Sequence, residues 1–281
     1  MNCLAGIVTF NPDLNRLFEN YNAISQQVDK VIFVDNNSSN IKDILRFCEE
    51  KDITIFSYKE NKGIACALKE IMEYAIRGGY DWVVTLDQDS VAKGGIIKEY
   101  QQYIADPLIG ALTCNVTDRN YIDKKQYSAR IEEVGTCLTS GCFMRVSAYK
   151  DTAGYDVRMF IDCVDFDICY SLRAAGYKIV RIPYDGLIHE IGNGRNIRFL
   201  GRNTMVFNHP AWRRYYANRN MIYIAKKHPR QLRMTAAMGR CVYRTIVIAI
   251  YEKDKINKFI FNIKGIIDGI KMKQNERKCG D

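Results

Sequence analysis

The sequence predicts an α/β fold in which helices cover a largely parallel sheet. Over the first 105 residues, short runs rich in β-branched and aromatic residues alternate four times with segments of helical length. The composition agrees, because 47% hydrophobic and 26% charged residues are typical of a folded chain with a sizeable core. Disordered, collagen-like and coiled-coil proteins are therefore excluded.

The predicted strands and helices follow one another in a regular order. We expect strands at residues 4–10, 30–35, 53–58 and 82–87, and helices at residues 13–28, 41–51, 64–77 and 95–105. Sheets of this type bind ligands outside the carboxyl ends of their strands. The turns that follow the strands are therefore the first place to search for a site.

The regular alternation ends after residue 105. We expect an apolar stretch at residues 109–116 and a Thr-Ser-Gly turn at 139–141. A helix at 165–175 that stops at a glycine and a further strand at 178–182 follow. Beyond Pro210 the pattern is helical. From Ile256 to Ile270, apolar residues recur at the spacing of an amphipathic helix, and lysines lie off the stripe.

The net charge of +9 is concentrated in the last third of the chain. Residues 201–281 contain 18 Lys and Arg against 5 Asp and Glu, or +13, whereas residues 1–200 contain 23 against 27, or −4. A basic region of this kind indicates an anionic partner without identifying it.

Ten cysteines are scattered singly, with no CxxC pair and no Cys/His cluster at zinc spacing. We expect reduced, mostly buried thiols in a cytoplasmic protein. The apolar start at residues 3–9 is too short for a signal peptide, and the apolar run at 246–251 is too short to cross a bilayer. We therefore expect no transmembrane segment.

Short polar side chains lie at or just after the ends of the first two predicted strands, among them Thr9, Asp13 and Asp35. A carboxylate at such a position can accept hydrogen bonds from a nucleobase N–H group or from a ribose hydroxyl. The alternative is purely structural, with Asp13 capping a helix and residues 35–39 forming a turn.

The third strand is followed by Asn61, Lys62 and Gly63, which open the next predicted helix. Free backbone N–H groups and a lysine at a helix start suit a phosphate. An ordinary loop-to-helix turn has the same composition, so the motif alone leaves both possibilities open.

Asp87 and Asp89 stand at the end of the fourth strand and project to the same side of an extended chain. Two such carboxylates suit Mg²⁺ or Mn²⁺, which could bridge to a diphosphate. One imidazole could complete the site, and His189 is the best placed of the three histidines. The alternatives are a capped turn and a structural histidine.

Two later segments carry further candidates. Residues 160–167 hold three acids, and their apolar neighbours would raise the pKa of a carboxylate and suit it to act as a general base; helix capping is the alternative. Residues 213–220 interleave arginines with tyrosines, which suits phosphates, whereas a solvated basic face is the alternative. No nucleic-acid-binding signature is present in the sequence.

Taken in order, six motifs resemble the family 2 glycosyltransferases of the GT-A fold. These are at residues 8–12, 34–38, 61–65, 86–90, 139–141 and 165–167. Within that family, the DQDS form of the acidic motif, the stretch at 160–167, the loop at 189–192 and the RYYxxRN segment at 214–220 are similar to the rhamnosyltransferase branch.

The resemblance implies a GT-A (Rossmann-like) nucleotide-sugar-binding mixed sheet flanked by helices, with a C-terminal helical extension. It implies a catalytic domain over residues 1–210, with its nucleotide-sugar half at about 1–115 and its acceptor half at about 116–210. The basic helical extension would then cover residues 211–281.

The resemblance also implies a role for each matched residue. The residues that would bind the nucleotide sugar are Thr9, Asp35, Asn61, Lys62, Asp87 and Arg219. Asp89 and His189 would hold the Mg²⁺ or Mn²⁺ ion, and Asp165 would be the general base of an inverting transfer. The residues on the acceptor side would be Thr139, Ser140, Gly141 and Asp162.

The resulting expectation is a cytoplasmic transferase at the inner face of the membrane. It would move a sugar, L-rhamnose from dTDP-L-rhamnose, onto a polyprenyl-diphosphate-linked or other saccharide of a bacterial surface polysaccharide such as O-antigen or capsule. A UDP-hexose donor is the alternative within the class, and a sugar nucleotidyltransferase is the alternative outside it, although residues 10–13 lack the glycine-rich basic loop of that class.

The basic tail has two interpretations. The stripe at 256–270 with its flanking lysines is typical of an interfacial helix drawn to anionic lipid, and the alternative is a helix that packs its stripe on the catalytic domain. We expect no nucleic-acid partner.

Overall fold

The computed structural model describes residues 1–119, 127–190 and 194–274. Part of the loop at 189–192 lies outside these residues, as does Cys279. The described chain forms two compact units. The first comprises residues 1–160 and 164–190, and the second comprises residues 161–163 and the described part of 191–281.

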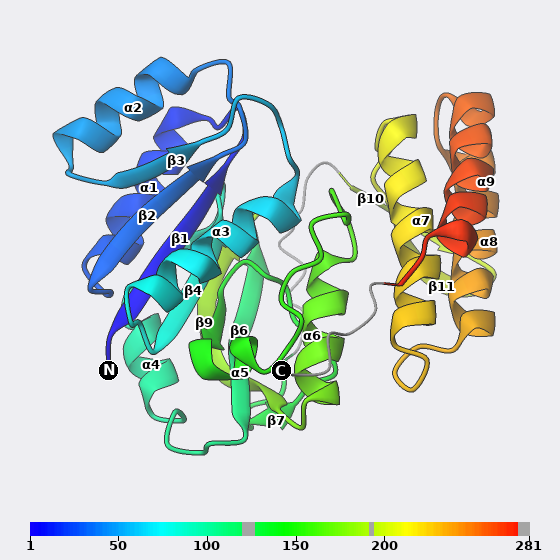
Figure 1. The fold of residues 1–281 in the computed structure, drawn as a ribbon. Coiled ribbons are helices and arrows are strands. Elements are labelled where there is room, and N and C mark those ends of the chain that lie inside the picture. The colour runs from blue at the N-terminus through cyan, green and yellow to red at the C-terminus, as the bar shows by residue number, and fades with distance from the viewer. Residues whose placement is uncertain (120–126, 191–193, 275–281) are drawn as a thin grey trace. The chain divides into compact units, whose positions relative to one another are not determined.

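The first unit begins with four parallel strands in the spatial order β3-β2-β1-β4 (Figure 1). Their bounds are Cys3–Thr9 for β1, Lys30–Asp35 for β2, Thr54–Ser57 for β3 and Trp82–Asp87 for β4. The connecting helices are α1 at Leu14–Ser25, α2 at Ile41–Glu50 and α3 at Ile64–Arg77. Each predicted strand and helix up to residue 87 is confirmed, with ends that shift by at most three residues; the helix predicted at 95–105 is also present and ends four residues early, at Gln101.

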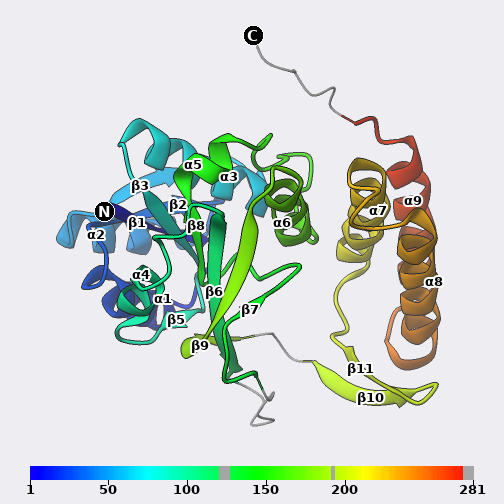
Figure 2. The same cartoon turned by 90° about the horizontal axis from the view of Figure 1, so that it is seen from below.

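The second half of the sheet is mixed. Its elements are β5 (Val91–Ala92), α4 (Ile96–Gln101), β6 (Ile109–Asp118), β7 (Glu132–Glu133), β8 (Cys142–Arg145), α5 (Val146–Lys150), α6 (Val164–Ala174) and β9 (Lys178–His189). β8 lies between β4 and β6 and is antiparallel to both, whereas β9 is parallel to β6 and antiparallel to β5. Helices α1, α2 and α4 cover one face of the sheet, and α3, α5 and α6 cover the other (Figure 2).

Strand β9 is longer than the five residues predicted for it. The predicted strand ends at Ile182, and the next residue is Pro183, which lacks the N–H group that a central strand requires. In the structure, the strand continues to His189 because the pairing of β6 with β9 shifts register between Thr113 and Asn115, and this shift accommodates the proline. The longer strand carries His189 to the edge of the sheet where β5 begins.

Aromatic packing anchors the middle of the sheet. The ring of Phe143 on β8 stacks on Trp82 of β4 at 4.8 Å and on Tyr100 of α4 at 5.3 Å between centroids. Stacked pairs of this size stabilise a core beyond the area they bury. The Tyr100 hydroxyl donates to the carbonyl of Gly141 at 2.7 Å, so the core also holds the loop that precedes β8.

The second unit contains a hairpin and three helices. The hairpin pairs β10 (Arg195–Phe199) with β11 (Arg202–Val206), and the helices are α7 (Ala211–Lys227), α8 (Met234–Tyr251) and α9 (Lys255–Lys271). The helical pattern predicted beyond Pro210 is confirmed, and the predicted stripe helix is α9. Within the described ranges, no helix is both long enough and apolar enough to cross a membrane.

The cysteines agree with the expectation of thiols. Seven of the nine cysteines in the described residues are buried, and none of the nine forms a disulfide. Cys137, Cys142 and Cys169 form a small cluster in which the Sγ of Cys137 lies 3.8 Å from each of the other two sulfurs.

Candidate functional site

The ends of β1, β2 and β4 meet at one edge of the sheet. In the parallel register, Thr9 pairs with Asp35, and Val8 on the other side pairs with Asp87. The turns that follow these strands therefore lie side by side, and this is the edge at which sheets of this type bind ligands.

Thr9 and Asp35 form a fully buried hydrogen-bonded pair. The Thr9 hydroxyl donates to Asp35 Oδ1 at 2.8 Å, and the other carboxylate oxygen accepts from the backbone N–H of Ser38 at 2.9 Å. Both residues are 0% exposed, so their side chains serve to shape the turn at 36–39. The structure extends this network to Asn11, whose backbone N–H donates to the Ser38 hydroxyl at 2.8 Å. The predicted contact of Thr9 and Asp35 with a nucleotide stays a prediction.

Asn61 and Lys62 stand at the start of α3, as predicted. The side-chain oxygen of Asn61 accepts from the backbone N–H of Gly63 at 2.9 Å, which forms an Asx turn. The ammonium of Lys62 lies 4.8 Å from the centre of the Tyr58 ring. Asp13, by contrast, takes the structural alternative, because its carboxylate caps α1 by accepting from the N–H of Arg16.

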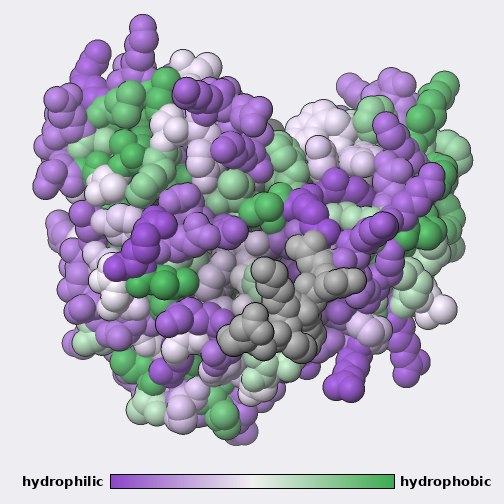
Figure 3. All heavy atoms as spheres, viewed as in Figure 1, coloured by the Kyte–Doolittle hydropathy of each residue, from purple (hydrophilic) through white to green (hydrophobic). Residues whose placement is uncertain are grey.

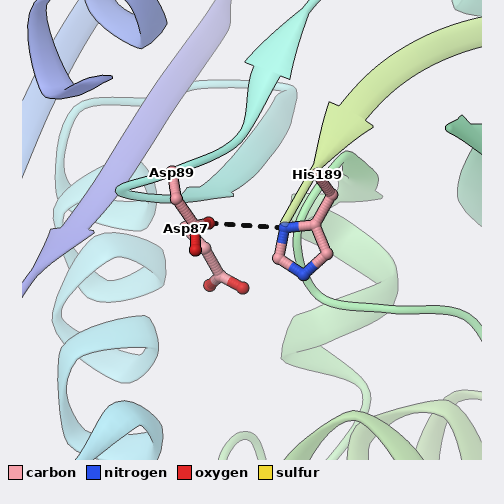
Figure 4. A group of neighbouring side chains, drawn as sticks. All are labelled: Asp87, Asp89 and His189. Atoms are coloured by element: carbon pink, nitrogen blue, oxygen red, sulfur yellow. Dashed lines mark ion pairs between the residues drawn. The ribbon is translucent and has the colours of Figure 1, made fainter. Parts of the chain in front are cut away.

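Asp87, Asp89 and His189 converge at the end of β4 (Figure 4). One ligand atom from each residue lies within 4.8 Å of the others, and Nδ1 of His189 is 3.4 Å from Oδ1 of Asp89. His189 is about a hundred residues away in the chain, but β9 pairs with β5 so that Ile188 lies opposite Val91. The predicted association of this histidine with the acidic motif is therefore observed.

A chain of hydroxyl groups supports the three side chains. The N–H of Asp87 donates to Ser140 Oγ at 3.0 Å, Ser140 donates to Ser90 at 2.7 Å, and Ser90 lies 2.8 Å from Nδ1 of His189. Asn20 of α1 donates to the carbonyl of Asp87 at 2.8 Å. Such partners fix the orientation of metal ligands.

The three side chains fit a hard divalent cation. Oδ1 of Asp89 is buried and, among the residues described, accepts no hydrogen bond of good geometry; its interaction with Nδ1 of His189 is long, at 3.4 Å. A carboxylate oxygen in this state is stabilised by a cation. Two carboxylates and one imidazole form a donor set suited to Mn²⁺ and, with more oxygen ligands, to Mg²⁺.

The pKa of His189 also indicates a site that favours a cation. Burial lowers the pKa of the imidazole, but the hydrogen-bonding and charge interactions with Asp89, together with the charges of Asp87 and Asp118, outweigh burial and raise the pKa above its usual value. The three carboxylates therefore create a negative potential at the ring, and this potential attracts a cation.

The Thr-Ser-Gly turn at 139–141 contacts the same site. Thr85 donates its hydroxyl to the carbonyl of Thr139, and the N–H of Gly141 donates back to the carbonyl of Thr85 at 2.8 Å. Ser140 is 2% exposed, and its hydroxyl lies beneath Asp87. The structure thus assigns Ser140 to the support of the acidic motif, and the predicted acceptor contacts of this turn stay predictions.

Asp165 lies in the first turn of α6 and is half-buried. Its Oδ1 accepts from the N–H of Phe166 at 2.9 Å. Cys169 lies one turn further along α6, and its pKa is raised well above the usual value, first by the hydrogen bond with Cys137 and then by burial. The charge of Asp165 contributes to the same rise in the pKa of Cys169.

Arg219 and Asp162 belong to the second unit. Arg219 hydrogen-bonds to the side-chain oxygen of Asn220 at 3.0 Å, and its guanidinium lies 4.7 Å from the centre of the Tyr216 ring. Asp162 has a φ of 64° and forms an ion pair with Arg213 at 3.0 Å. The predicted donor contact of Arg219 and the predicted acceptor contact of Asp162 stay predictions.

The sequence interpretation missed three supporting residues, Ser90, Asn20 and Ser38. Ser90 stood inside the DQDS motif but was given no role. Asn20 had a visible signal, because it is a polar residue on the buried face of α1 between Leu17 and Ile24. Ser38 was treated only as part of a turn.

Comparison with known proteins identifies a family and a fold. The family model "Glycosyl transferase family 2" matches residues 5–159, which is more than half of the chain. The chain is 26% identical over 289 aligned residues to the protein named "dTDP-rhamnosyl transferase RfbF" of Shigella flexneri, and the match covers 96% of each sequence.

Solved structures resemble the chain in fold at low sequence identity. S. aureus TarS 1–349 matches 95% of this chain and 81% of its own chain, with a TM-score of 0.62 and 14% identity. In the complex of TarS 1–349 with UDP, the match covers 68% of this chain and 61% of the other, with a TM-score of 0.54 and 15% identity. The mannosyltransferase PcManGT of Pyrobaculum calidifontis, in complex with GDP-Man and Mn²⁺, matches 96% and 86% of the two chains, with a TM-score of 0.58 and 13% identity. The predicted GT-A fold is confirmed.

Proposed function

Because the chain belongs to glycosyl transferase family 2, we propose that it is an inverting, metal-dependent rhamnosyltransferase that uses dTDP-L-rhamnose as its donor. That it is a glycosyltransferase follows from the family. The observation that carries the rest is the convergence of Asp87, Asp89 and His189 at the carboxyl edge of the parallel strands. The choice of rhamnose is supported by the likeness to the Shigella flexneri dTDP-rhamnosyl transferase over 96% of the chain.

The donor would bind across the turns that follow β1, β2 and β3. The buried Thr9–Asp35 pair holds the turn at 36–39 in place, and exposed groups of that turn would face the base and the ribose. Asn61 and Lys62, at the start of α3, would close over the nucleotide. A nucleotide donor agrees with the UDP and GDP-Man named for the structural neighbours.

Asp89 and His189 would hold a Mg²⁺ or Mn²⁺ ion, whose positive charge would offset the negative charge that develops on the departing diphosphate. Asp87 would contact the ribose side of the donor. Ser90 and Ser140 would keep the imidazole and the Asp87 backbone in place through their hydrogen bonds.

Asp165 would act as the general base. Its carboxylate accepts the proton of the acceptor hydroxyl as the oxygen forms a bond to the anomeric carbon, and the bond from that carbon to the diphosphate oxygen breaks with its electron pair. Because the hydroxyl attacks from the face opposite the leaving group, the configuration inverts. The N–H of Phe166 donates to this carboxylate and fixes its orientation.

The acceptor would be a saccharide, polyprenyl-diphosphate-linked or otherwise lipid-linked, of a bacterial surface polysaccharide. Thr139 and Gly141 would lie on its side of the site. The enzyme would work at the inner face of the cytoplasmic membrane as a peripheral protein, with no nucleic-acid partner.

A panel of donors tests this proposal. Purified protein with Mn²⁺ is incubated with dTDP-rhamnose, UDP-glucose, UDP-GlcNAc and GDP-mannose, and release of the nucleoside diphosphate and protection against thermal unfolding are measured. We expect dTDP-rhamnose to give the largest protection and the fastest release. Equal or stronger effects of another sugar nucleotide would refute the rhamnose assignment.

A UDP-hexose donor is the second candidate. It is favoured by the UDP named in the complex of TarS 1–349. The same panel distinguishes the two, because uridine and thymidine donors are compared under one condition.

A further inference from the structure

Helix α9 packs through its polar and small residues and exposes its apolar stripe. The residues that it buries are Lys258, Asn262, Gly265 and Gly269. On the outer side, Ile256 is 77% exposed and Ile260 is 55% exposed. An amphipathic helix of a globular domain normally buries the opposite face, so this orientation requires a specific cause.

The two glycines provide one part of that cause. A Cβ atom at Gly265 would lie 2.4 Å from the carbonyl oxygen of Tyr215, and one at Gly269 would lie 2.6 Å from that of Arg219. Both of those carbonyls belong to α7. Only glycine allows the two helix backbones to approach this closely, so the side of α9 that bears the glycines is the side that fits α7.

Buried polar pairs provide the other part. Lys258 forms an ion pair with Glu252 at 2.8 Å, with both side chains 3% exposed. Asn262 accepts a hydrogen bond from Asn218 of α7 at 2.9 Å. Rotating α9 to bury its isoleucines would break these pairs and place the isoleucines against a contact shaped for glycine. The packing of α9 therefore keeps the stripe on the surface.

Helix α8 extends the exposed apolar surface. Val242, Ile246 and Ile250 recur at a spacing of four residues, and each is between 46% and 50% exposed. Figure 3 shows hydrophobic side chains gathered along the edge of the second unit that α8 and α9 form. The α8–α9 apolar face consists of Val242, Ile246, Ile250, Ile256, Phe259, Ile260, Ile263, Ile267 and Ile270.

The charges around this face are mostly positive. Residues from 201 onward carry +13 in sequence. Glu252 is neutralised by Lys258, and Asp268 accepts a hydrogen bond from Tyr215 at 2.9 Å. Lys264 and Lys271, in contrast, are exposed on α9 beside the apolar residues. A second copy of the chain would bring like charges together at this face, whereas an anionic bilayer would pair them.

We propose that the α8–α9 apolar face binds the surface of an anionic lipid bilayer, with its isoleucines among the acyl chains and its lysines at the headgroups. This inference deepens the proposed function, because it identifies the surface that would bring the enzyme to a lipid-linked acceptor. Vesicle binding itself requires no turnover, so it is tested independently of the donor, the acceptor and the chemistry.

Co-sedimentation of the full chain with vesicles tests the inference. The vesicles contain phosphatidylethanolamine with phosphatidylglycerol, or phosphatidylcholine alone as the neutral reference. One test variant carries Ile260→Glu and Ile267→Glu together. The other carries Ile256→Glu alone, because the side chain of Ile256 is the most exposed of the face. Leu45→Glu is the matched control, because Leu45 is an exposed aliphatic residue on helix α2 of the other unit, at 43%. Thermal unfolding establishes that each variant is folded.

We expect the wild type to bind the anionic vesicles, and this binding to weaken with added salt. Binding to the neutral vesicles should be at least about fivefold weaker. The Ile260→Glu/Ile267→Glu variant and the Ile256→Glu variant should each bind the anionic vesicles at least about tenfold more weakly than the wild type. Leu45→Glu should bind as the wild type does. Lys264→Glu with Lys271→Glu should lose preference for the anionic lipid. Equal vesicle binding by all variants would overturn the proposal. The proposal would also be overturned if the wild-type protein did not bind vesicles and instead formed a dimer that the double variant Ile260→Glu/Ile267→Glu does not form.

Discussion

Gly63→Ala tests how the start of α3 supports the donor site. Gly63 has a φ of +82° and a ψ of 167°, a conformation that is open in practice only to glycine. A Cβ atom there would lie 2.3 Å from the carbonyl oxygen and 2.7 Å from the Cα of Phe160. Both neighbours are backbone, so no side chain can rotate away. Either the 61–63 loop or the chain at Phe160 must move by about 1 Å to restore an ordinary contact.

The energetic consequence has two parts. The unfavourable backbone conformation costs about 1–3 kcal/mol. Displacement of the loop also breaks the hydrogen bond that the N–H of Ile64 donates to the carbonyl of Phe160 at 2.9 Å; such a bond contributes about 1 kcal/mol net. We expect a destabilisation of about 2–4 kcal/mol, which lowers the Tm of a unit of this size by roughly 5–15 °C.

Gly79→Ala is the matched control. Gly79 has a similar φ of +69°, but a Cβ atom there would meet nothing within 4 Å. Its cost is backbone strain alone, about 1–2 kcal/mol. Differential scanning calorimetry measures both variants, and isothermal titration measures dTDP binding with Mn²⁺. Because the displaced loop carries Asn61 and Lys62, Gly63→Ala should also weaken dTDP binding about tenfold or more. Equal destabilisation of the two variants, with wild-type nucleotide affinity in both, would refute the reasoning.

Three other substitutions give separate predictions. Asp165→Asn should lower kcat by about 10² to 10⁴ with little change in donor affinity, because an amide accepts no proton; steady-state kinetics measures this, and near wild-type turnover would remove Asp165 from the mechanism. Ser90→Ala should weaken Mn²⁺ binding about 10- to 100-fold, because His189 loses the hydroxyl that orients its ring; an unchanged affinity in a metal titration would contradict the support role. Lys258→Ala should destabilise the second unit by about 3 kcal/mol, because it leaves Glu252 as an unpaired buried carboxylate, and adding Glu252→Gln should recover part of the loss in thermal unfolding. A double variant no more stable than Lys258→Ala would contradict the burial argument.

The sequence was sufficient for the parallel half of the fold because each element there has a local signal. Trp82–Asp87 and Ile64–Arg77 were predicted at their observed bounds, since an apolar run or a helical period ends at turn residues in each case. Strands β5 and β7 have two residues each, too few for a periodic signal. Their place in the sheet depends on pairing with β9, which is a tertiary effect.

The site was predictable in its residues but not in its connections. The sequence analysis grouped His189 with the acidic motif on chemical grounds, whereas their approach in space depends on the β5–β9 pairing, which no local pattern encodes. The predicted acceptor-side role of Ser140 stays a prediction, but its hydrogen bond from the N–H of Asp87 could not be foreseen, because it depends on the pairing of the turn at 139–141 with Thr85. The period of α9 was found in the sequence, but the face that packs is set by the fit of Gly265 and Gly269 against α7.

Metal-dependent nucleotide binding tests directly whether Asp87, Asp89 and His189 hold a metal ion at the donor site. Isothermal titration of dTDP into wild type and Asp89→Ala, each with Mn²⁺ and with EDTA, isolates the ion held by the Asp87, Asp89 and His189 group. We predict that wild type binds dTDP at least about tenfold more tightly with Mn²⁺ than with EDTA, and that Asp89→Ala shows no such difference. An Asp89→Ala protein with the wild-type Mn²⁺-dependent affinity would show that this group does not hold the ion.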